Sequence, residues 1–135
     1  MKAWINEAAV ELCKAYGEKA KEVSAIAFAD LSEVPWLLQF GVSAFLGSTI
    51  SSDHANLRSL LEEAGLAADL VRPYELVADW DGSFKAKLGV VSSDQYTLFV
   101  VFDGKVSAVL REGDGSPDEV KAKYLLAMRS ALDQV

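Results

Sequence analysis

The sequence predicts a domain of the α/β class, with an α+β arrangement as the alternative. The order of predicted elements favours this class: a helix, a strand, two helices, a strand, a short helix, a β-hairpin and a terminal helix. The composition is that of a globular protein, since 51% of the 135 residues are hydrophobic and 24% are charged. A chain of this length buries a core without disulfides or metals. We therefore expect residues 1–135 to form a single domain in which helices flank a sheet.

The N-terminal third begins with a helix and a strand. In residues 2–16 apolar side chains recur at helical spacing, and Gly17 stands where helices commonly end. The run 23–29, Val-Ser-Ala-Ile-Ala-Phe-Ala, is rich in small and branched residues and is followed by the turn-forming Asp30-Leu31-Ser32. Its length and its bounding turns favour a short strand.

Residues 34–50 form the most apolar run of the chain, and no charged residue interrupts it. At 17 residues the run is shorter than the roughly 20 that span a bilayer, so we expect no membrane segment. Pro35 suits the first turn of a helix. Because apolar residues would cover all sides of this helix, we expect it to be buried all round. The candidate surface for a partner or ligand is Trp36, Leu38, Phe40, Phe45 and Leu46.

The middle of the chain contains local signals for a second helix, a strand and a short helix. Ser51-Ser52-Asp53 offers an N-cap and an acidic first turn for a second helix over 53–64. Residues 75–79, Glu-Leu-Val-Ala-Asp, predict a strand. A turn at 79–82 follows, and residues 83–89 allow one or two helical turns.

The C-terminal third predicts a hairpin and a helix. Strands over 96–102 and 105–110 flank Asp103-Gly104, a pair that suits a two-residue turn because both residues can adopt positive φ. The sequence Ser116-Pro-Asp-Glu119 combines an N-cap serine, proline at the first helical position and glutamate at the third. This capping-box pattern predicts the start of the terminal helix.

The charge and cysteine content exclude several functional classes. Twenty acidic against 13 basic residues give a net charge of -7, and no cluster of Lys and Arg could neutralise consecutive phosphates, so nucleic acid is not an expected partner. Cys13 is the one cysteine, so the chain has neither an internal disulfide nor a CxxC pair. The N-terminus lacks the apolar core of a signal peptide, which leads us to expect a cytoplasmic location.

Individual side chains give no convincing catalytic or metal site. A nucleophilic Cys13 needs a lowered pKa, but the one histidine, His54, falls far away in sequence in the first turn of the predicted second helix. Asp53 and His54 are adjacent, so they point in different directions and do not make a ligand set. The aspartates lack the spacing of a calcium loop and are interpreted as turn and cap residues: Asp79, Asp81, Asp114 and Asp118. We expect no metal and no cofactor.

Two stretches together resemble a known family. Residues 75–90, in which a strand ends in Asp79-Trp-Asp-Gly82 before a short helix, and the hairpin 99–113 are similar to redoxins, the peroxiredoxin-like branch of the thioredoxin superfamily. Residues 15–30 also resemble the end of that family's first helix and the strand after it. The resemblance implies a thioredoxin-like sheet flanked by helices, with a C-terminal hairpin and a terminal helix.

The departures from the family bear on function. Redoxins begin with a central strand that delivers a peroxidatic cysteine or a CxxC motif to the first helix, whereas this sequence starts with that helix. Cys13 lies about three turns into the helix and does not match the nucleophile. No proline precedes the strand 97–102, where the family usually carries a cis-proline. The resemblance therefore carries over no catalytic residue, and an enzymatic role is not favoured.

Three functional hypotheses follow. The leading one is a non-catalytic thioredoxin-like domain that acts by protein binding or homo-oligomer assembly, as a homodimer that uses the helix 34–50 or an open sheet edge. The second is a carrier of a small apolar ligand, with a pocket lined by aromatic residues: Trp4, Trp36, Trp80, Phe40, Phe45 and Tyr96. The third is a thiol-dependent peroxidase or reductase that uses Cys13.

Overall fold

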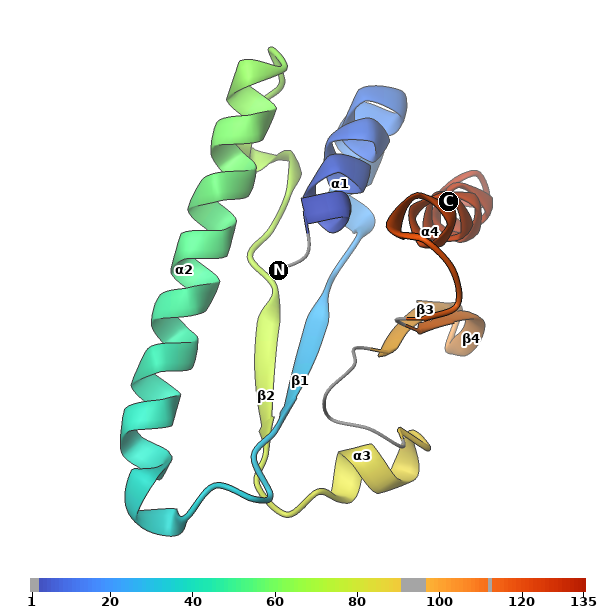
Figure 1. Ribbon diagram of the computed structural model, residues 1–135. Coiled ribbons are helices and arrows are strands. Elements are labelled where there is room, and N and C mark those ends of the chain that lie inside the picture. Colours follow the sequence, from blue (N-terminus) through green and yellow to red (C-terminus); the bar gives the residue numbers. More distant parts are fainter. Residues whose placement is uncertain (1–2, 91–96, 112) are drawn as a thin grey trace.

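The computed structural model describes residues 3–90, 97–111 and 113–135, and for Phe28, Phe40, Ser43 and Leu76 it describes the backbone alone. It confirms a mixed α/β fold (Figure 1). The helices are α1 (Ala3–Tyr16), α2 (Gln39–Glu63), α3 (Ser83–Lys87) and α4 (Pro117–Leu132). The strands are β1 (Ile26–Asp30), β2 (Glu75–Asp79), β3 (Thr97–Phe102) and β4 (Lys105–Arg111). Short 3-10 helices lie at η1 (Gly17–Glu22), η2 (Trp36–Leu38) and η3 (Ala68–Leu70).

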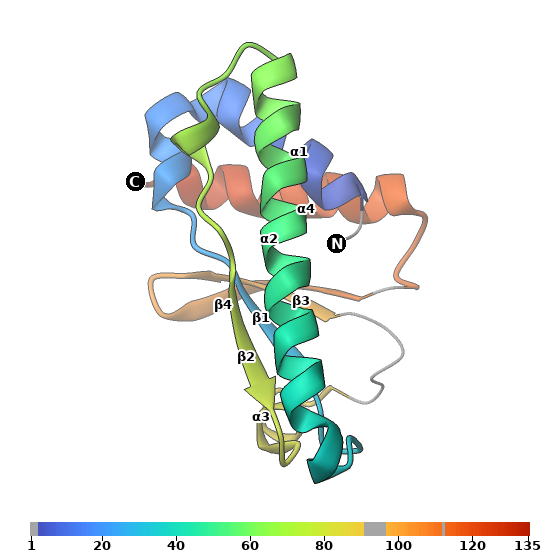
Figure 2. The same cartoon turned by 90° about the vertical axis from the view of Figure 1, so that its left-hand side faces the viewer.

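The described strands form two separate pairs instead of the single sheet that the sequence predicts. β1 and β2 are parallel, with Ile26 opposite Glu75 and Asp30 opposite Asp79. β3 and β4 are antiparallel and make a pair of their own. Figure 2 shows the hairpin running across the direction of the β1–β2 pair rather than alongside it.

Helices α1 and α4 pack on each other and, through α4, on the hairpin. Their shared core contains Ala8, Leu12, Val100, Leu125, Met128 and Leu132. Beside it, Trp4 packs with Leu110 and Val120, and its ring meets that of Tyr124 edge-on at a centroid distance of 5.6 Å. The amphipathic pattern of both helices explains this core, because each turns one apolar stripe toward the other.

The predicted turn and cap of the C-terminal third are confirmed. Asp103 and Gly104 adopt φ angles of 51° and 72°, as a primed two-residue turn requires. The Ser116 hydroxyl oxygen accepts a hydrogen bond from the Glu119 N–H at 3.3 Å, with Pro117 in the first turn of α4. Tyr96, predicted to begin the first strand of the hairpin, lies outside the described residues.

The predicted break between two helices at Ser51-Ser52-Asp53 is wrong, because α2 continues for 25 residues through this position. The Ser51 hydroxyl donates to the carbonyl oxygen of Gly47 at 3.3 Å, within the helix, instead of capping a new one. No proline falls inside α2 to force a break. The predicted strand 23–29 corresponds to β1, which begins three residues later and ends one residue later, at Ile26–Asp30.

Candidate protein-binding surface

The N-terminal half of α2 and the preceding η2 expose large apolar side chains. Trp36 is 76% exposed, Leu38 59% and Phe45 69%. Leu37, which the sequence prediction left out, is 71% exposed. We call these four residues the η2–α2 surface. Within one chain the run 34–50 is therefore not buried all round, contrary to prediction.

The reason for this exposure is that α2 is anchored at its other end. Leu57 and Leu61 in the C-terminal half are buried, and Leu61 packs with Cys13, Ala20 and Leu70. Figure 1 shows α2 standing beside the β1–β2 pair, with its C-terminal end near α1 and its N-terminal half extending away from that helix. Of the other two candidate residues, Leu46 is partly buried and the side chain of Phe40 is outside the described part.

The face of α2 that carries Phe45 is otherwise built from small residues. Gly41, Ala44 and Ser48 are exposed, and their spacing from Phe45 places them on the same side of the helix. A Cβ atom added at Gly41 would meet nothing within 4 Å. Sequence analysis missed these three small residues, although positions 41, 44 and 48 recur at the spacing that places residues on one side of a helix. The exposed ring of Phe45 thus stands beside an open, shallow part of the helix surface.

Two hydroxyls of this region form hydrogen bonds within the helix itself. No residue from 34 to 52 carries a charge. The Thr49 hydroxyl donates to the carbonyl oxygen of Phe45 at 3.0 Å, as that of Ser51 does to Gly47. Because these two hydroxyls are satisfied inside the helix, covering them leaves neither without a hydrogen bond.

The second candidate surface is the outer edge of β1. The Ala25 carbonyl accepts from the Glu75 N–H at 3.0 Å, and the Leu31 N–H donates to the Asp79 carbonyl at 2.9 Å. Because alternate residues of a strand bond to the same neighbour, the main-chain groups of Ile26 and Asp30 point away from β2. Among the described strands β1 pairs with β2 alone. Its other edge has no paired strand in the described part of the chain, and Ile26 there is 56% exposed.

Charged side chains gather where β1 and β2 end. Asp30 accepts hydrogen bonds from the Ser32 hydroxyl at 2.6 Å and N–H at 3.1 Å, and from the Lys85 ammonium at 3.0 Å. These contacts, the Ser32 hydroxyl foremost, lower the pKa of Asp30 to about 2. Together they fasten the turn after β1 to the start of α3.

Asp79 is the buried member of the group, at 3% exposure. Its Oδ2 accepts from the Lys85 N–H at 3.0 Å, whereas its Oδ1 has no hydrogen-bond partner among the described residues. Asp81 receives the Ser83 N–H at 3.0 Å, and Asp114 receives that of Arg111 at 2.9 Å. In the described ranges no three His, Cys, Asp or Glu side chains are grouped as a metal site requires.

Cys13 lies in the core rather than at a reactive position. It is 2% exposed, and burial raises the pKa of its thiol above the usual value. The thiolate that nucleophilic attack requires is therefore disfavoured. His54 sits partly buried in the middle of α2 instead of the predicted first turn of a helix. Its neighbour Asp53 accepts a hydrogen bond from the Tyr74 hydroxyl at 2.9 Å.

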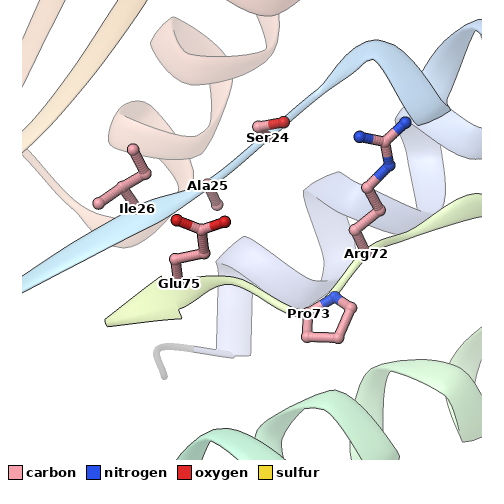
Figure 3. Close-up of a pocket in the computed structure, with 6 residues that line it drawn as sticks. All are labelled: Ser24, Ala25, Ile26, Arg72, Pro73 and Glu75. Atoms are coloured by element: carbon pink, nitrogen blue, oxygen red, sulfur yellow. The ribbon is translucent and has the colours of Figure 1, made fainter. Parts of the chain in front are cut away.

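The aromatic residues proposed for a ligand pocket are spread over the molecule. Trp4 is in the core with Tyr124, Trp36 and Phe45 are exposed, and Trp80 is partly buried. Tyr96 and the side chain of Phe40 fall outside the description. A pocket of about 130 Å³ opens where β1 and β2 begin (Figure 3). It is below the usual size of ligand pockets, about 300–1,000 Å³. Its lining is Ser24, Ala25, Ile26, Arg72, Pro73 and Glu75.

Comparison with known proteins adds no relative: no protein-family model, no curated protein and no solved structure matches this chain. Within the described ranges, no helix is both long and apolar enough to cross a membrane. The candidate binding surface is therefore defined by the exposed apolar side chains of η2 and α2.

Proposed function

We propose that this chain is a non-catalytic, thioredoxin-like domain that acts by protein binding or assembly, and that its partner covers the η2–α2 surface. One observation carries the proposal: four large apolar side chains, three on η2 and one about two turns further along α2, are 59–76% exposed in a stretch without any charge. Large exposed apolar patches on water-soluble domains commonly mark interaction sites.

The size of the surface supports binding to a macromolecule. Aromatic side chains bury about 150–250 Å² each, so the exposed parts of Trp36, Phe45 and the two leucines amount to on the order of 400 Å². That area lies within the roughly 300–600 Å² of the largest apolar patch on a typical monomer, a patch that is often functional. The surface is a helix face rather than a concavity, whereas small apolar ligands need an enclosed pocket.

The thioredoxin-like assignment rests on the sequence resemblance and on element order. A helix, a strand, a long helix, a second strand parallel to the first, a short helix, a hairpin and a terminal helix follow one another. The non-catalytic role is supported by the burial of Cys13 and the raised pKa of its thiol.

Site-specific photo-crosslinking tests the proposal. A benzophenone amino acid replaces Phe45, and the control variant carries it at Leu126, which is 73% exposed on α4, remote in sequence from the surface. Both variants are made in cells that normally contain the protein and are irradiated there. We expect a discrete crosslinked product from position 45 in clear excess over position 126. Equal, diffuse labelling from both positions would mean that no partner covers the η2–α2 surface.

A further inference from the structure

We propose that the partner at the η2–α2 surface is a second copy of this chain, packed helix against helix about a two-fold axis near residue 43. This inference rests on the proposed function and names its partner. It is carried by the pattern of large and small residues along the exposed face, by the distribution of charge and by the area available.

The exposed face is complementary to itself when it is reversed. Leu38, Gly41, Phe45 and Ser48 follow one another along it, large and small in alternation, and all four are exposed. In an antiparallel pair of α2 helices centred on residue 43, Phe45 of each copy lies over Gly41 of the other. Leu38 then lies over Ser48. Leu38 and Phe45 thus each meet a small residue, an arrangement that allows two helices to pack closely.

The space that this packing needs is open in the protomer. The position of a Cβ at Gly41 has no neighbouring atom within 4 Å, so a phenyl ring from another copy can approach the helix backbone there. Packing within the protomer does not require glycine at 41, and glycine near the start of a helix lowers helix stability. A close contact from a second copy explains why this position carries glycine although the protomer does not need it there.

The charge distribution favours a second copy over a partner selected by charge. Each chain carries -7, and two such chains repel each other over most of their surfaces. Residues 34–52, which include η2 and the N-terminal half of α2, carry no charge. Contact within this range therefore brings no like charges together. A basic partner, by contrast, would find no carboxylate on this surface to bind.

The area predicts a reversible dimer. Even with Trp36 and Leu37 included, two copies bury no more than about 800 Å² in total, which is the range of weak or transient contacts rather than of permanent dimers. We therefore expect association in the micromolar range, with Phe45 as the central anchor.

Sedimentation equilibrium from low to high micromolar concentration tests the inference. The wild type should change from the mass of one chain to that of two. Phe45→Glu should raise the dissociation constant at least about thirtyfold, the loss expected at an interface hot spot. The matched control, Leu126→Glu, adds the same charge at a similarly exposed leucine and should leave the dissociation constant unchanged. Circular dichroism of each variant verifies that it folds.

The variant Gly41→Leu distinguishes the proposed packing from nonspecific association of apolar surfaces. The substitution adds apolar surface where the protomer has room for it, so the protomer stays folded. In the dimer it occupies the place of the other copy's Phe45, so dimerisation should weaken at least tenfold. Unchanged or tighter association of this variant would overturn the antiparallel arrangement, as would a wild type that stays monomeric or a Leu126→Glu variant that weakens equally.

The crosslinking experiment distinguishes failure of this inference from failure of the proposed function. A product of twice the chain mass that contains peptides of this chain alone supports both. A product that contains another protein leaves the proposed function in place and overturns the second copy. A ligand or lipid attached to position 45 overturns both, because neither is a protein partner.

Discussion

Asp30 is the residue whose titration is most clearly tied to the fold. The Ser32 hydroxyl and N–H and the Lys85 ammonium all donate to its carboxylate, and the pKa falls to about 2. An ordinary aspartate has a pKa of about 3.9. Because the folded-state pKa is the lower one, the carboxylate stabilises the fold above about pH 4, and this contribution is lost as the pH falls through about 2.

Replacing Asp30 by Asn should therefore destabilise the protein in a pH-dependent way. We expect a lower free energy of unfolding than the wild type at pH 7, and a difference that shrinks as the pH falls from about 4 toward 2. Urea unfolding over this pH range measures it, with Glu62→Gln on the exposed side of α2 as the control. A difference that is the same at every pH would contradict the assigned role of the carboxylate.

Individual residues were predictable from sequence only where local chemistry decides their role. The absence of a CxxC pair predicts no redox role for Cys13, and the structure places this side chain in the core. Trp36, Leu38 and Phe45 were identified as a candidate surface because of their apolar context. Leu37 and Gly41 were missed, because exposure and free space depend on how distant segments pack, which no local pattern reports.

At the scale of elements, the N-cap of α4 offers a direct test. The Ser116 hydroxyl accepts the Glu119 N–H, which has no acceptor inside the helix. Ser116→Ala should cost about 1 kcal/mol of unfolding free energy, whereas Ser116→Asp should retain most of it, because aspartate is an equally good cap. The same serine-to-alanine change at the exposed Ser130, inside α4, is the control. Chemical denaturation that shows equal losses at 116 and 130 would refute the cap.

Elements with strong local signals were predicted well, and the long helix was not. The strand at 75–79, the Asp-Gly hairpin and the helix start at Ser116 all depend on turn and capping chemistry within a few residues. Ser51-Ser52-Asp53 carries a similar signal, but serine hydroxyls also bond to carbonyls four residues earlier inside a helix. The parallel pairing of β1 with β2 and the separation of this pair from the hairpin involve segments far apart in sequence, which local patterns do not report.

At the scale of the whole molecule, net charge sets how association responds to salt. Two copies at -7 each give a dimer of -14 (2 × -7), so general repulsion opposes assembly. Added salt screens this repulsion and also strengthens contact between apolar surfaces when the anion is sulfate.

The dissociation constant of the dimer should therefore fall as sodium chloride is added, and fall further with sodium sulfate. Sedimentation at a series of salt concentrations measures this trend, with Phe45→Glu as a protein that should stay monomeric at low salt. The opposite trend, weaker association in salt, would show that ion pairs rather than the uncharged η2–α2 surface hold the copies together.

Lys85 links the short helix α3 to both strands of the parallel pair. Helix α3 has five residues, too few to persist alone in water. Its Lys85 reaches Asp79 at the end of β2 through its N–H, and Asp30 at the end of β1 through its ammonium. These two aspartates become neighbours only when β1 and β2 align in register. The stability of α3 therefore depends on the pairing of β1 with β2, because its tertiary hydrogen bonds exist only where the two strands are in register.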